Sequence, residues 1–295
     1  MKEHRLLQVD AFTSRPLEGN PCAVVLDADD LDAATMLAIA REMNLSETAF
    51  VLRSTVADFR ARYFTPAEEI PMAGHPTIAT TWALVEEGRL ALRGERTTFS
   101  LELPVGPIRV DIVAEDRRVT GIVMTQKKPA FLRTYDAADV LPAFGLAAAD
   151  ALSGVPVQTV STGTPQLMIA LRSQEALRRA APDVRGYGAL RSSGDFFSPH
   201  LFCLGGFTPA GQTSARHFGV PPDTPEDPFT GSATGGMAAF LWRYGLLAEP
   251  VFTAEQGHWM KRPGVARVEV VGPREDIEAV RVGGMAVTVL RGVLG

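Results

Sequence analysis

The sequence predicts an α+β protein made of two similar halves, and three observations lead to that prediction. A stretch of 23 residues occurs twice, at residues 69–91 and 226–248. Each copy contains an apolar, helix-like segment between two glycines, and short apolar runs separated by a turn precede each copy. Repetition of a unit that contains both strand and helix patterns indicates two domains of one kind.

The repeat is specific at the level of single residues. At a fixed offset of 157 positions, eight of the 23 positions are identical, whereas chance would give one or two at roughly one position in fifteen. The excess indicates an internal duplication. The identical residues are Glu69, Pro71, Gly74, Thr77, Leu84, Gly88, Leu90 and Ala91, which align with Glu226, Pro228, Gly231, Thr234, Leu241, Gly245, Leu247 and Ala248.

Each half opens with a short apolar run, a Gly-x-Pro turn and a second apolar run. The turns are residues 19–21 and 163–165. The pattern predicts two strands joined by a turn. Alanine- and leucine-rich stretches follow at residues 30–43 and 173–181, and they predict a helix in each half. Prolines and glycines near residues 115–130 indicate the crossover between the halves, and we place the boundary between residues 118 and 119.

The segment between the paired glycines predicts a buried helix of about twelve residues in each half. Gly88 and Gly245 would end these helices as the C′ residues. In the first half Pro76 would occupy the first helical position, which makes His75 the cap. Ser232 would be the equivalent cap in the second half.

The N-termini of these two helices predict an anion site. Their unpaired N–H groups and positive dipole ends favour a carboxylate, which Gly74 and His75 would bind in one half and Gly231 and Ser232 in the other. If the halves face each other, both ends point into one cleft. The alternative is that both segments are simply capped core helices.

Composition and charge exclude several classes of protein. The net charge is −5 and no run of Lys or Arg occurs, which argues against a nucleic-acid partner. No segment approaches the roughly 18 apolar residues of a membrane span, and the N-terminus has no apolar leader, so we expect a cytoplasmic protein. Cys22 and Cys203 lie in apolar runs and are expected to be buried thiols. The histidine and cysteine spacing supports no metal site.

Four segments together resemble the PhzF-type phenazine biosynthesis family of isomerases. They are VDAFTSRPLEGNPCAVV, MNLSETAFV, FTPAEEIPMAGHPT and PEDPFTGSATG, in this order, and the likeness covers nearly the whole chain. The resemblance implies a diaminopimelate epimerase-like fold: two pseudo-twofold-related domains, each a curled, mostly antiparallel sheet around a central helix. It also implies that a C-terminal strand, residues 283–295, joins the N-terminal half, residues 1–118, while residues 119–282 form the second half. A homodimer is implied as well.

The resemblance further implies a proton shift without metal or organic cofactor. The family's archetype isomerises trans-2,3-dihydro-3-hydroxyanthranilate, so the expected partner is a small carboxylate substrate. Glu47 in LSETAF corresponds to the family's catalytic glutamate, and His75 and Asp227 correspond to its other catalytic residues. Ser232 corresponds to its serine, which we expect to bind substrate. Phe229 departs from the usual alanine, and a bulky ring beside Asp227 is expected to reshape the pocket.

Three other functions compete with this interpretation. A two-thiol epimerase or racemase would need a cysteine before each helix glycine, where this chain has Ala73 and Thr230. A hydrolase triad of Ser232, His75 and Asp227 lacks the G-x-S-x-G elbow. A non-catalytic protein that binds a small anion or another protein would retain the fold without the chemistry.

Overall fold

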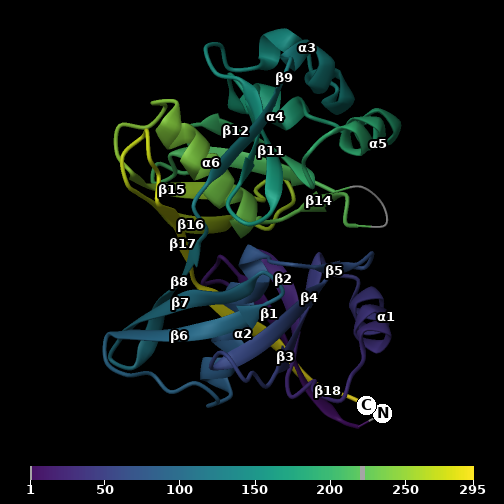
Figure 1. Cartoon of the computed structure of the whole chain (residues 1–295), viewed down its shortest axis with the longest axis vertical. Helices are drawn as coiled ribbons and strands as arrows, with labels where there is room; N and C mark the ends of the chain where they lie inside the picture. Colours follow the sequence, from purple (N-terminus) through teal and green to yellow (C-terminus); the bar gives the residue numbers. More distant parts are fainter. Residues whose placement is uncertain (1, 220–222) are drawn as a thin grey trace. The chain divides into compact units, whose positions relative to one another are not determined.

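A computed structural model describes residues 2–219 and 223–295 of the chain (Figure 1). The chain forms two compact units. The first comprises the chain up to Thr125 together with Val282–Gly295, and the second comprises Gln126–Arg281. The crossing after Thr125 lies within one continuous strand, β8 (Arg118–Gln126), which pairs with the preceding strand and then leads into the second unit.

The first unit is a mixed, mostly antiparallel sheet with two helices. Its strands hydrogen-bond in the order β18, β1, β2, β3, β4, β6, β7, β8, and β5 pairs with β4. Within this order, as far as the structure describes it, the pairs β2–β3 and β4–β6 are parallel. The elements are β1 (His4–Ala11), β2 (Asn20–Val25), α1 (Ala33–Met43), β3 (Glu47–Leu52), β4 (Phe59–Phe64), β5 (Glu69–Ile70), α2 (Gly74–Glu86), β6 (Arg96–Leu103), β7 (Gly106–Glu115), β8 and β18 (Ala286–Leu294).

The second unit repeats this order. Its strands run β9, β10, β11, β12, β13, β15, β16, with β14 on β13, and its parallel pairs are β11–β12 and β13–β15. The elements are β9 (Ala130–Tyr135), α3 (Ala137–Val140), η1 (Leu141–Phe144), η2 (Ala148–Asp150), β10 (Val157–Ser161), β11 (Pro165–Ala170), α4 (Gln174–Arg179), α5 (Val184–Ser193), β12 (Ser198–Leu204), β13 (Thr213–Phe218), β14 (Glu226–Asp227), α6 (Gly231–Arg243), β15 (Val251–Gln256), β16 (Gly264–Val271) and β17 (Ala279–Gly284).

Side-chain contacts repeat along with the strand order. Arg62 donates to both carboxylate oxygens of Glu69 at 2.7 and 2.6 Å, and Arg216 does the same to Glu226 at 2.8 and 2.7 Å. The guanidinium of Arg216 also lies 4.6 Å from the ring centre of Phe218. That of Arg62 lies 5.2 Å from the ring centre of Phe64, the equivalent residue. These matched contacts place the duplication that the sequence indicates in three dimensions.

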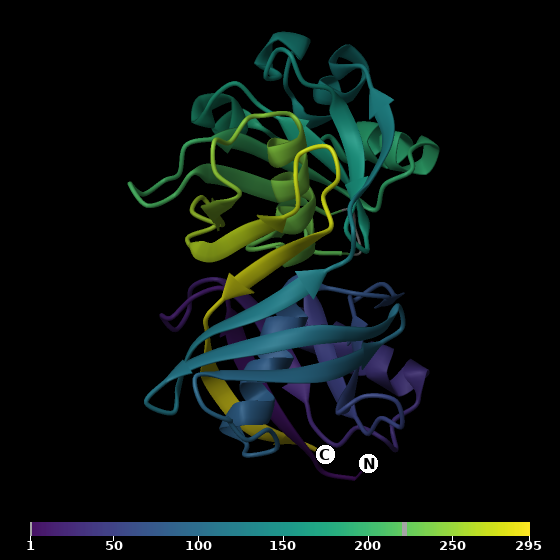
Figure 2. The ribbon, with the colours of Figure 1, turned by 60° about the vertical axis from the view of Figure 1, so that its left-hand side comes forward.

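The helices α2 and α6 form the centre of their units. Figure 2 shows α2 enclosed by strands, and it contacts β1, β2, β3 and β18. Most residues of both helices are buried. In α6, close packing favours a glycine at position 235, because a Cβ there would lie 1.8 Å from the amide oxygen of the buried Gln126. The predicted buried helices are therefore confirmed.

Of the helix ends predicted from the sequence, the C-termini agree with the structure and the N-termini do not. Gly88 and Gly245 are the C′ residues, with φ of 68° and 70°, as predicted. The predicted caps are wrong, because the N-cap residues are Ala73 and Thr230. Pro76 is the third helical residue, a place that a proline tolerates because the first four N–H groups of a helix have no partner within it.

Other predicted elements agree with the structure. Strand pairs β1–β2 and β10–β11 are antiparallel and enter their second strand at the Gly-x-Pro turns. The helices predicted at 30–43 and 173–181 are α1 and α4. Both cysteines are free and buried, as expected. Among the described residues, no helix combines the length and apolar character that crossing a membrane requires.

Candidate active site

Glu47 is the first residue of β3. It lies opposite Cys22 in the parallel β2–β3 register. The strand that follows, from Thr48 to Val51, is buried because its apolar side chains pack in the core. The Glu47 side chain itself is 16% exposed and lies at the edge of the core, with its Oε2 atom buried.

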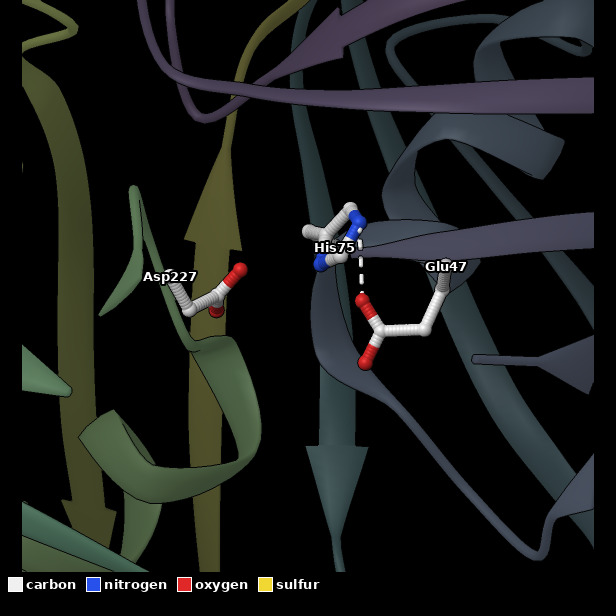
Figure 3. Close-up of side chains that lie close together, drawn as sticks. All are labelled: Glu47, His75 and Asp227. Atoms are coloured by element: carbon white, nitrogen blue, oxygen red, sulfur yellow. Dashed lines mark ion pairs between the residues drawn. The ribbon is translucent and has the colours of Figure 1, made fainter. Parts of the chain in front are cut away.

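His75 lies next to Glu47. It is the second residue of α2, and its Nε2 is 3.2 Å from Oε2 of Glu47 (Figure 3). Its side chain is 3% exposed, and burial lowers its pKa to about 3. The imidazole is therefore neutral at neutral pH. With a neutral ring, the contact is not an ion pair but a close approach of Nε2 to the Glu47 carboxylate.

The other ring nitrogen of His75 also has a partner. Nδ1 is 2.9 Å from Nδ2 of Asn20, the first residue of β2. Asn20 is fully buried. Sequence reasoning treated it only as the middle of a Gly-x-Pro turn, and no local pattern links it to a histidine 55 positions away.

Buried polar groups lie next to Glu47 and the first turn of α2. Cys22 is fully buried, and its pKa is raised well above the usual value, first by burial and then by the charge of Glu47. Its thiol therefore stays protonated. The hydroxyl of Tyr63 lies 3.0 Å from Oγ1 of Thr77, which donates to the carbonyl of Ala73 at 2.8 Å. These bonds hold the first turn of α2.

In the second unit, Asp227 ends β14 (Figure 3). Its Oδ2 accepts a hydrogen bond from Oγ1 of Thr230 at 2.5 Å. The buried Gln256 fixes both residues, since its Nε2 donates to the Asp227 carbonyl at 2.7 Å and its Oε1 accepts from the Thr230 amide at 3.2 Å. Sequence reasoning missed Gln256, which occupies the last position of β15.

Gly231 and Ser232 begin α6. The Gly231 carbonyl accepts from Nε2 of Gln126 at 2.8 Å, and the Gln126 Oε1 accepts from Oγ1 of Thr162 at 2.5 Å. Ser232 is 6% exposed. The first turn of α6 is thus held by buried side chains, as is the first turn of α2.

The predicted site residues are divided between the two units. Glu47, His75 and Gly74 lie together in the first unit, and Asp227, Gly231 and Ser232 lie within one turn and its following helix in the second. Phe229 needs a correction. Its ring is fully buried and lies against Gly264 in β16. A Cβ at position 264 would come within 2.5 Å of the ring, so the glycine leaves the space that the ring occupies. The ring thus fills the core of its own unit.

Comparison with known proteins identifies close relatives. The family model described as "Phenazine biosynthesis-like protein" matches residues 9–292. A relative from Pseudomonas fluorescens, named trans-2,3-dihydro-3-hydroxyanthranilate isomerase, is 34% identical over 295 residues, which is 99% of each chain. A Bacillus subtilis relative named as the uncharacterized isomerase YfhB is 35% identical and covers 92% of each chain.

Solved structures agree in fold. A phenazine biosynthesis protein of the PhzF family from Bacillus anthracis is 30% identical, with a TM-score of 0.88 and full coverage of both chains. A hydroxyproline epimerase from Agrobacterium vitis, solved with trans-4-hydroxy-L-proline, has a TM-score of 0.68 at 13% identity. It covers 99% of this chain and shares its α+β fold.

Proposed function

The chain belongs to the phenazine biosynthesis-like (PhzF) family of isomerases, and we propose that it moves a proton on a small carboxylate by general acid/base catalysis. The expected substrate is a cyclic or unsaturated amino or hydroxy carboxylate, similar to the compound in the name of the Pseudomonas relatives. The single observation that carries the proposal is the Glu47–His75 pair: a partly exposed carboxylate beside a buried, neutral imidazole.

Glu47 is the proposed acid and base. A proton shift between two carbons needs a group that removes the proton from one carbon and returns it to another on the same face. One carboxylate close to both carbons performs both steps. His75 is neutral, so its role is to donate a hydrogen bond to Glu47 or to charge that develops on the substrate, not to act as a cation.

The remaining predicted residues have supporting roles in this proposal. The N–H groups at Gly74–His75 and at Gly231–Ser232 would bind the substrate carboxylate, as helix N-termini bind anions. Asp227 would stabilise developing charge or transfer protons at heteroatoms. The buried anchors of both first turns support these roles, because rigid donors stabilise charge without having to reorganise.

The alternatives have less support. A two-thiol epimerase needs reactive thiolates, yet burial raises the pKa of Cys22 and raises that of Cys203 to about 11. A hydrolase triad would need a ring nitrogen of His75 directed at a serine, but Nδ1 lies 2.9 Å from Nδ2 of Asn20 and Nε2 lies 3.2 Å from the Glu47 carboxylate. Non-catalytic binding of a small anion or a protein stays an alternative that the following experiment addresses.

The test is isomerisation in deuterated water. We expect the wild-type protein to convert trans-2,3-dihydro-3-hydroxyanthranilate and to place deuterium on the receiving carbon, which proton NMR detects. Glu47→Gln, which keeps the shape but removes the base, should lower the rate by a factor of about 100 or more. Glu42→Gln, the same change at an exposed position of α1, should leave it unaltered.

Equal activity of wild type and Glu47→Gln would refute the acid/base assignment. Failure of both to convert this compound, with exchange of solvent deuterium into another small carboxylate by wild type alone, would retain the chemistry and change the substrate. Absence of exchange with every carboxylate tested would favour the binding protein. The cytoplasmic location and the homodimer stay predictions, and sedimentation measures the latter.

A further inference from the structure

Asn20 and His75 form a buried hydrogen bond that nothing in the proton shift requires by itself. Asn20 is fully buried, His75 is 2% exposed, and the two nitrogens are 2.9 Å apart. A neutral imidazole carries one proton, and the partner of each ring nitrogen decides where that proton resides. An amide N–H group that donates to Nδ1 leaves the proton on Nε2, the nitrogen that faces Glu47.

The opposite arrangement is electrostatically unfavourable. If the Asn20 amide were rotated, its oxygen would face Nδ1 and the proton would move there. The bare Nε2 would then face the Glu47 carboxylate at 3.2 Å, with two acceptors in contact at the edge of a buried region. The donor orientation of Asn20 avoids this cost.

The backbone holds Asn20 in place for this role. Asn20 pairs with Ala11 in the β1–β2 register. Gly19, just before it, has φ of 60°, and a Cβ there would lie 2.2 Å from the Ala11 carbonyl oxygen. Gly19 is therefore required by the turn that brings the amide of Asn20 to the imidazole.

We propose that Asn20 is a positioning residue that fixes His75 as the neutral Nε2–H tautomer, so that this imidazole presents a hydrogen-bond donor to Glu47. The inference rests on the proposed function of Glu47 for its catalytic meaning. An N–H group on that side of the ring is complementary to a carboxylate, the form of Glu47 that removes a proton from the substrate. Asn20 acts through His75, whose Nδ1 it contacts.

The test is the tautomer itself, measured without substrate. Protein labelled with ¹⁵N-histidine at neutral pH gives two-bond proton–nitrogen correlations, and His75→Gln assigns the His75 signals. We expect wild type to show a protonated Nε2 and a bare Nδ1. Asn20→Asp replaces the donor with a carboxylate that accepts, so the proton should move to Nδ1 or both nitrogens should be protonated.

Asn44→Asp is the matched control, because Asn20 and Asn44 are the only asparagines in the sequence. Asn44 has φ of 51° after α1, a conformation that aspartate also tolerates. It should leave the His75 signals and the rate unchanged. Asn20→Asp should lower kcat about tenfold or more and change KM less, since a wrong tautomer impairs the chemical step.

A wild-type spectrum with the proton on Nδ1 would overturn the inference, and so would an unchanged tautomer in Asn20→Asp. If Asn20→Asp does not fold, the wild-type spectrum alone decides. Because the spectrum needs no substrate, loss of the proposed isomerisation would leave this result standing. Conversely, activity on the test compound with the Nδ1 tautomer would refute the role of Asn20 alone.

Discussion

The packing of Phe229 depends on the small size of Gly264. Its ring is fully buried, and Gly264 in β16 provides the space for it. Phe229→Ala should therefore lower the free energy of unfolding by about 3–5 kcal/mol, the cost of an aromatic cavity. Phe229→Leu should cost less. Urea unfolding measures both, with Val184→Ala, which is 60% exposed, as a control that should stay within about 0.5 kcal/mol.

A double-mutant cycle checks that the two residues act together. Gly264→Ala alone should destabilise the protein, because the added methyl group meets the ring. In Phe229→Ala that methyl group enters empty space, so the double variant should be more stable than the sum of the single changes predicts. Additive effects would contradict the contact.

At the scale of elements, both central helices end in the same motif. After α2, Gly88 donates to Val85 and Arg89 donates to Leu84, and after α6 the equivalent residues repeat both bonds. This Schellman arrangement requires a left-handed residue. It explains why the paired glycines predicted both helix C-termini correctly.

Gly88 therefore offers a test of backbone conformation alone. No atom lies within 4 Å of an added Cβ, so Gly88→Ala meets no steric obstacle. It should still cost about 1–2 kcal/mol, because φ of 68° is unfavourable for alanine. Gly88→Asn should cost less, since asparagine tolerates this conformation. Denaturant unfolding that gives equal stability for wild type and Gly88→Ala would contradict the motif.

The helix N-termini were harder to predict from the sequence. Ala73 and Thr230 cap the helices without a side-chain hydrogen bond to the helix, so the usual cap preference carries no signal there. The first turns are held instead by distant side chains such as Gln126 and Gln256. Such contacts depend on the tertiary fold, which local patterns do not encode.

The candidate site was predictable to a similar extent. Glu47 at the start of a strand and His75 beside a helix glycine were predicted, and the structure places them 3.2 Å apart. Asn20 was not predicted to belong to the site, because a turn alone explains the Gly-Asn-Pro sequence. Its amide is assigned to His75 only once β2 and α2 are packed together.

At the scale of the whole molecule, the two similar units have different side chains at equivalent positions. Glu47 faces Cys22 across β2–β3, and Ser198 occupies the equivalent place opposite Gln166 across β11–β12. Ser198 donates to Gln166 at 2.7 Å and lies 2.8 Å from Nε2 of His217. The second unit thus has a neutral network where the first has an acid, which accords with a single carboxylate acting as the base.

Three buried histidines, His75 in the first unit and His200 and His217 in the second, predict how stability depends on pH. Burial lowers the pKa of His75 and His217 to about 3. The pKa of His200 is well below its usual value, first because of burial and then because of His217, whose Nδ1 lies 3.3 Å away. In the unfolded chain all three return to about 6.5.

The sign follows from proton binding. Between pH 6.5 and 3 the unfolded chain binds protons that the folded protein excludes, so stability is full above pH 6.5 and falls as the pH decreases. Each histidine should cost about 1.4 kcal/mol between pH 7.5 and 5.5, or about 4 kcal/mol for the three. Carboxylates with lowered pKa, such as Asp150, contribute mainly at lower pH, because they are still ionised in both states at pH 5.5.

Urea unfolding at pH 7.5, 6.5 and 5.5 measures this dependence. His217→Gln keeps a polar group near Ser198 but removes one titrating ring, so its stability should fall by about 1.4 kcal/mol less than that of wild type over the same range. A wild-type profile that stays flat down to pH 5.5 would mean that the buried rings accept protons in the folded state. An unchanged slope in His217→Gln would assign the dependence to other groups.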